Sequence, residues 1–188
     1  MTVWNSTRGR STERRLRLAI LSGVALLASP ATAQPVEEHQ LKAAVLYNLT
    51  KFVEWPPAAF KSAIDPISIC LFGESPIAGA LERAISGQTI GERRLVVRKV
   101  ATVQNALECR ILFFSALGRT RWRSMLSDLR APAVLTVGEA DTFAEDGGMV
   151  NLKTDGAKIR IQVNPEAARR EGIQISSRLL SLAQIVQK

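Results

Sequence analysis

Short, almost wholly apolar runs constrain the fold of this chain more than any other feature. Residues 67–72 read ISICLF and residues 111–114 read ILFF. A strand with one solvated face alternates apolar and polar residues, so continuous apolar runs are typical of strands covered on both faces. Residues 95–100 and 134–137 also have the pattern of strands.

Amphipathic segments alternate with these strands. Between Val36 and Val53, apolar residues recur at helical spacing, and Pro56 ends that helix by pushing Trp55 out of the α region. We predict further helices at 76–85, 102–108, 118–129 and 165–170, a last one after Ser176 or Ser177, and a hairpin with its turn at 154–157. This alternation predicts an α/β fold: a single domain with a mainly parallel, mixed β-sheet flanked by helices on both faces.

The first 33 residues have the pattern of a secretory signal peptide. Arg14, Arg15 and Arg17 precede an apolar stretch at 18–27, and Ala31-Thr32-Ala33 predicts cleavage before Gln34. The alternative is a membrane-anchored N-terminal helix, but the apolar stretch is shorter than the roughly 20 residues that span a bilayer. We therefore expect a signal peptide at 1–33 and an exported α/β domain at 34–188.

The predicted leader also accounts for part of the basic charge. It carries five arginines and one glutamate, so its removal lowers the formal net charge from +8 to +4. A mature chain at this charge need not bind nucleic acid, and it has no second long apolar run that would insert into a membrane.

The two cysteines, Cys70 and Cys109, are expected to form a disulfide, because an exported chain meets an oxidising compartment. The bond would close a loop of 39 residues and stabilise the fold by roughly 3–4 kcal/mol. The alternative is a pair of buried thiols in strands.

The sequence contains few residues and motifs that are typical of catalytic sites. His39 is the only histidine and lies near the predicted mature terminus, and the chain has no metalloprotease, paired-cysteine or P-loop motif. Asp141, Glu145 and Asp146 cluster before two glycines and could bind a cation or act as acid and base, although charges in such a loop are more often solvated. The residues favour a non-enzymatic binding protein with neither metal nor cofactor.

A small-ligand cleft is a second hypothesis. Gly73 and Ser75 begin a predicted helix after a buried strand, where a phosphate could bind, although ordinary helix capping explains them as well. Together with Trp55 they could line a cleft.

Six segments, in the same order along the chain, have the pattern of one known family. The first is residues 41–56, LKAAVLYNLTKFVEWP. The others are ICLFG at 69–73, CRILF at 109–113, GGMVN at 147–151, VNPEAA at 163–168 and ISSRLLSLA at 175–183. Together these segments resemble the YfiR family of periplasmic proteins, and the resemblance spans essentially the whole predicted mature chain.

The resemblance implies a function as well as a fold. It implies a periplasmic repressor that binds the periplasmic sensor region of an inner-membrane diguanylate cyclase of the YfiN type, lowering cyclic-di-GMP and biofilm formation. It also implies a homodimer and a disulfide at Cys70 and Cys109. The partner surface is expected in the C-terminal half, here at Met149, at Val150 and at Ile185, which lies in the predicted last helix. The alternative is a periplasmic small-ligand-binding protein that modulates another membrane receptor or a sensor kinase.

Overall fold

The apolar run at 67–72 forms β2 (Ile67–Phe72), the strand on which the sheet is built. The computed structural model describes residues 34–115, 119–129 and 133–187, so the predicted signal peptide lies outside the described residues. β2 pairs in parallel with β4 (Arg93–Val100) on one side and β5 (Ile111–Phe114) on the other. Every residue of β2 and β5 is buried, which confirms the prediction from their apolar runs.

The remaining strands complete a mixed sheet. β6 (Leu135–Gly138) and β7 (Val150–Asp155) continue the parallel part, and β8 (Lys158–Val163) returns antiparallel to β7. β3 (Thr89–Ile90) and β10 (Gln184–Ile185) are the edge strands, in the order β10-β8-β7-β6-β5-β2-β4-β3. The predicted hairpin is confirmed, with Gly156 at φ +59° in its turn.

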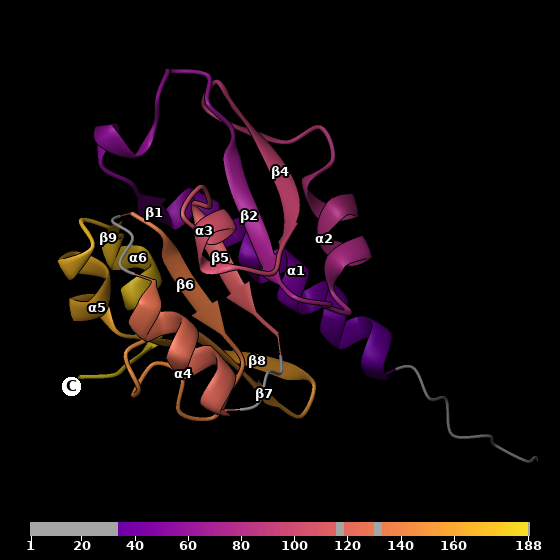
Figure 1. Cartoon of the computed structure of the whole chain (residues 1–188). Coiled ribbons are helices and arrows are strands. Elements are labelled where there is room, and N and C mark those ends of the chain that lie inside the picture. The colour runs from indigo at the N-terminus through magenta and orange to yellow at the C-terminus, as the bar shows by residue number, and fades with distance from the viewer. Residues whose placement is uncertain (1–33, 116–118, 130–132, 188) are drawn as a thin grey trace, which may run out of the picture. The chain divides into compact units, whose positions relative to one another are not determined.

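The two faces of the sheet build two separate cores. Odd-numbered residues of β2 pack with α1 (Gln34–Phe52) and α2 (Ala78–Ile85), whereas even-numbered ones pack with α3 (Val103–Ala106) and α4 (Arg119–Asp128). In Figure 1, α3 and α4 lie in front of the sheet and α1 lies behind it. The predicted α/β fold with helices on both faces is therefore confirmed.

α1 ends at Phe52, before the proline segment at 55–57, and runs directly into one strand of a separate pair. β1 (Val53–Glu54) pairs antiparallel with β9 (Gln174–Ile175), and the short 3-10 helix η1 (Pro57–Ala59) follows. The Trp55 side chain packs against the same core as α1, and its indole N–H donates to the Arg110 carbonyl at 3.2 Å.

Two helix predictions need correction. α2 begins after Ile77, and the Ser75 side chain forms no cap; instead its carbonyl accepts from the Ala78 N–H at 3.2 Å in a turn. The expected last helix is the single turn α6 (Ser177–Leu180), capped by Ser176, and the chain then extends into β10. β10 can form because the exposed edge of β8 offers backbone hydrogen bonds to a parallel strand.

No helix in the described part of the chain is long and apolar enough to cross a membrane.

Candidate functional site

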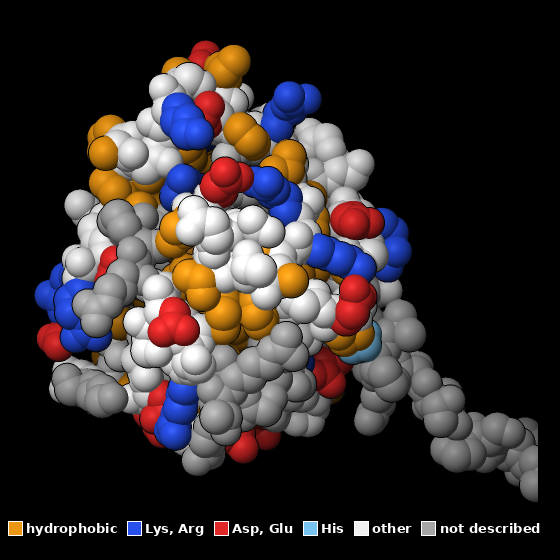
Figure 2. Space-filling view, viewed as in Figure 1, with side chains coloured by type: hydrophobic (Ala, Val, Ile, Leu, Met, Phe, Trp, Pro, Cys, Tyr) orange, Lys and Arg blue, Asp and Glu red, His pale blue; other side chains and the backbone are white. Residues whose placement is uncertain are grey.

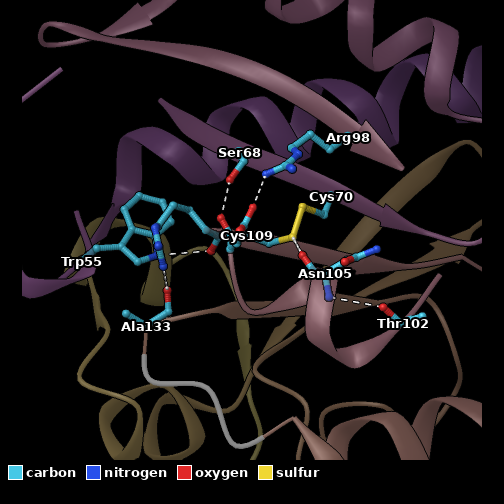
Figure 3. The surroundings of a disulfide bond; sticks show 10 residues. Trp55, Ser68, Cys70, Arg98, Thr102, Asn105, Cys109 and Ala133 are labelled. Atoms are coloured by element: carbon cyan, nitrogen blue, oxygen red, sulfur yellow. Dashed lines mark hydrogen bonds and ion pairs between the residues drawn. A yellow bond between two sulfur atoms is a disulfide. The ribbon is translucent and has the colours of Figure 1, made fainter. Parts of the chain in front are cut away.

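Cys70 and Cys109 are joined in the predicted disulfide (Figure 3). Cys70 lies on the even face of β2, Cys109 lies just before β5, and their Cα atoms are 5.9 Å apart. Both residues are fully buried. Thr102 caps α3 by accepting from the Asn105 N–H, so the disulfide ties an ordered helical turn to the central strand.

Polar contacts hold the segment before Cys109 in the same place (Figure 3). The Ser68 hydroxyl donates to the Glu108 carbonyl at 2.9 Å, and Arg98 pairs with the Glu108 carboxylate at 3.0 Å. The link between α3 and β5 is thus fastened to both β2 and β4.

A hollow of about 570 Å³ opens beside this link, and we call it the Arg110 groove. Its walls are the segment 59–66, the even face of β2 and β4, and the end of α3. Its lining residues are Ala59, Phe60, Lys61, Asp65, Pro66, Ser68, Val96, Arg98, Leu107, Glu108 and Arg110. The volume is within the range of small-molecule and peptide sites. Figure 2 shows apolar side chains between Lys and Arg side chains on the upper part of this face.

Arg110 is held rigidly at the groove. Its N–H donates to the Ser68 carbonyl at 2.9 Å, and its own carbonyl accepts from the Trp55 indole. The guanidinium donates to the Ala133 carbonyl at 3.3 Å and lies 5.4 Å from the centre of the Phe60 ring. The backbone and the head of this side chain are therefore both anchored.

The charge of Arg110 is partly desolvated without an ion-pair partner. Burial lowers the pKa of its guanidinium, the charge of Asp65 opposes that shift, and the charge of Arg93 adds to it. Among the described residues, no carboxylate lies within ion-pair distance of Arg110 or of Lys61. Asp65 is already occupied, because it accepts from Ser62.

A second charged cluster lies where β5 and β6 end. Lys42 of α1 is 7% exposed and pairs with Glu139 and, at 2.6 Å, with Glu38, while Ser115 donates to Glu139 at 3.1 Å. Burial alone lowers the pKa of Lys42, but the hydrogen bonds and charges of the two glutamates outweigh it and raise that pKa above its usual value. This cluster attaches α1 to the carboxyl edge of the sheet.

We expect Glu139→Gln to lower the free energy of unfolding by about 2 kcal/mol, because a hydrogen bond to a buried charge is weakened while Glu38 still pairs with Lys42. Denaturant unfolding at neutral pH measures the change. Glu74→Gln is the control: Glu74 also pairs with a lysine, Lys99, but its side chain is 90% exposed, so the change should be close to zero. Equal losses in the two variants would contradict the structural importance of the buried cluster.

The sequence pattern of one family extends over nearly all of this architecture. The YfiR/HmsC-like family matches residues 39–184, from within α1 to the first residue of β10. The chain belongs to the YfiR/HmsC-like family. The resemblance noted in the sequence is therefore confirmed at the level of the family, and a search of curated proteins finds no match.

Two solved structures are similar to this YfiR/HmsC-like chain. One is a conserved domain protein from Vibrio cholerae, with 14% identity and a TM-score of 0.51 over 82% of this chain. The other is an ABC domain in complex with L-Trp from Streptococcus pneumoniae, with 12% identity and a TM-score of 0.46 over 79% of this chain. The chain spans 60% of the length of each. At 14% identity, the similarity to the Vibrio cholerae protein shows only a shared fold.

Two of the segments that resemble the YfiR family, residues 163–168 and 147–151, contain residues with a structural role. Asn164 is 1% exposed; its side-chain oxygen accepts from the Ala167 N–H to cap α5 (Pro165–Arg170), and its amide donates to the Ala144 carbonyl. Gly148 lies against the Phe143 ring, where a Cβ atom would come within 2.1 Å of a ring carbon. These residues hold the loop at 139–149 against the sheet.

The expected cleft of Trp55, Gly73 and Ser75 does not form in this YfiR/HmsC-like fold. Trp55 lies at the start of β5, beside Ser68, whereas Gly73 and Ser75 follow the opposite end of β2. These positions are separated by roughly 16 Å along the strand. The wrong expectation arose because the chain order of the residues does not show which end of the sheet each one occupies.

The residues expected to contact a partner also separate. Met149 and Val150 are 4% and 0% exposed and belong to the core, because they enter a strand covered by helices. Ile185 is 41% exposed but lies in β10 rather than in a helix. Of the three side chains, only that of Ile185 is accessible at the surface.

The acidic loop forms surface contacts. Asp141 pairs with Lys153 at 3.6 Å, and Asp146 pairs with Arg123 at 2.5 Å. The described residues contain no group of three or more side chains able to hold a metal ion.

The Arg110 groove was not predicted from the sequence, because its walls come from separate segments. The only local signal for it was an arginine directly after Cys109.

Proposed function

We propose that this chain is a periplasmic regulator of cyclic-di-GMP signalling that acts by binding another protein. The supporting observation is the family match over residues 39–184, which extends from within α1 to the first residue of β10 and is not limited to one motif. In the finer form of the proposal, the chain represses an inner-membrane diguanylate cyclase by binding its periplasmic sensor region. Repression then lowers cyclic-di-GMP and biofilm formation, and the chain works as a homodimer without catalysing a reaction.

The proposal agrees with the chemistry of the chain. A disulfide links buried parts of the fold, and such bonds persist in an oxidising compartment such as the periplasm. The leader-like sequence at 1–33 would direct export.

Deletion of the gene should raise intracellular cyclic-di-GMP in the native host, because the cyclase loses its repressor. Mass spectrometry of cell extracts measures the level. A gene copy that encodes the exported chain should restore the low level, and a copy without residues 1–33 should not. Restoration by the leaderless form would contradict action from the periplasm.

An unchanged level after deletion would count against regulation of a cyclase. It would favour the other function consistent with an exported binding domain, a small-ligand-binding protein that modulates a different receptor.

A further inference from the structure

The described surface carries four exposed large apolar side chains, and they form two separate pairs. Ile64 and Leu107, 71% and 37% exposed, are at the Arg110 groove: Ile64 lies in the turn between the lining residues Lys61 and Asp65, and Leu107 lines the groove itself. Leu182, 75% exposed, lies just before the last strand β10, and Ile185, 41% exposed, lies within it. Exposed apolar side chains rimmed by polar ones commonly mark a contact surface.

Charge distinguishes the groove from an ordinary apolar hollow. Its two acidic residues already interact within the protein. Glu108 forms an ion pair with Arg98, and Asp65 accepts a hydrogen bond from the Ser62 hydroxyl. Its two remaining cations, Arg110 and Lys61, have no carboxylate at ion-pair distance among the residues that the structure describes. With three cationic and two acidic lining residues, the groove therefore carries a net positive charge next to apolar surface, and the charge of Asp65 partly offsets that of Arg110.

The geometry of Arg110 suits recognition of a carboxylate. The Ala133 carbonyl and the Phe60 ring fix the guanidinium, so little side-chain freedom remains to be lost on binding. A guanidinium presents several N–H donors in a planar fork that matches a carboxylate, and the pair is strong where water is partly excluded.

We propose that the Arg110 groove is the surface on which this chain holds its protein partner, and that the partner contributes a segment with a carboxylate beside an apolar side chain. The carboxylate binds Arg110 and Lys61, and the apolar side chain packs against Phe60, Val96 and Leu107. This inference rests on the proposed function for the idea that the chain acts by binding a protein, and it adds the place and the chemistry of the contact.

Substitutions of exposed residues test the groove without disturbing the core. Ile64→Glu and Lys61→Glu should each abolish at least half of the lowering of cyclic-di-GMP that the wild-type chain produces in the deletion strain. Leu182→Glu is the matched control, since it places the same charge on an equally exposed apolar position away from the groove, and it should repress as well as wild type. Immunoblots of periplasmic fractions and melting curves of the purified variants verify equal amounts and intact folds.

The results separate the inference from the function on which it rests. If deletion raises cyclic-di-GMP but the two groove variants still repress, the function stands and the groove is excluded. Loss of repression in Leu182→Glu, alone or together with the groove variants, also overturns the assignment, because the effect would then not be specific to the groove.

A second readout does not depend on any cyclase. The isotope-labelled chain is titrated with a short peptide that alternates leucine and glutamate, and with its glutamine counterpart, while amide NMR signals are followed. The glutamate peptide should shift signals of residues 60, 96, 107 and 110, with a dissociation constant at least threefold lower than that of the glutamine peptide. Equal binding of both peptides, or no shift in the groove with either, would refute recognition of a carboxylate there.

Discussion

Gly148→Ala should lower the free energy of unfolding by about 3 kcal/mol, because the loop at 139–149 has no room for one more methyl group. A Cβ atom at Gly148 would lie 2.1 Å from Phe143 Cε1, and one at Gly138 would lie 2.4 Å from Cδ2 on the other side of the same ring. Phe143 is fully buried between Trp122 and Phe114, with ring centres 5.1 and 5.6 Å away, so it cannot move aside. Denaturant unfolding followed by circular dichroism measures the loss.

Two companion variants make this prediction specific. Gly79→Ala should be neutral or stabilise the protein by up to about 1 kcal/mol, since Gly79 is at an exposed position of α2 and its Cβ would meet only the end of the Arg83 side chain, at 3.5 Å. Phe143→Leu should itself destabilise, yet the double variant with Gly148→Ala should lose less than the sum of the two single losses. Strict additivity would show that Gly148 is constrained by something other than the ring.

Removal of the disulfide by Cys70→Ala with Cys109→Ala should have the largest effect, a loss of about 4 kcal/mol. The bond closes a loop of 39 residues, so without it the unfolded chain gains conformational entropy. The sulfur atoms are buried in the core of the even face, so their removal also deletes packing there.

Wild-type protein that has been reduced in denaturant and refolded with reductant is the control for the lost covalent bond. It should unfold close to the double variant and well below the oxidised protein. The explanation would fail if the double variant unfolded within 1 kcal/mol of the oxidised wild type. In that case the reduced, unfolded chain would retain enough structure to cancel the entropy term.

The central strands were largely predictable from sequence because burial on both faces favours continuous apolar residues. β2 and β5 have the bounds that their apolar runs indicated, and α5 begins at Pro165 after a capping asparagine. The disulfide was also predictable from the expected compartment, the cysteine count and the family resemblance. In each case a local pattern or a simple chemical requirement determined the outcome.

The surface was not predictable in the same way. Whether Met149 lies in the core or at the surface depends on the helices that cover its strand. Ser75 does not cap α2, because this helix begins later than the local pattern suggested. The Arg110 groove depends on the path of the segment after η1 over β2 and β4, which no short window of sequence contains.

The pairing of β1 with β9 places the first and last parts of the described chain side by side, since Val53 lies opposite Ile175. During synthesis the N-terminal part emerges first, yet the segment after α1 has no strand partner until almost the whole chain is available. Contacts between residues so distant in sequence also form slowly, because a long loop must close before they are gained. We therefore expect β1 to pair late in folding, and a chain that ends before residue 174 would leave β1 without β9 as its partner.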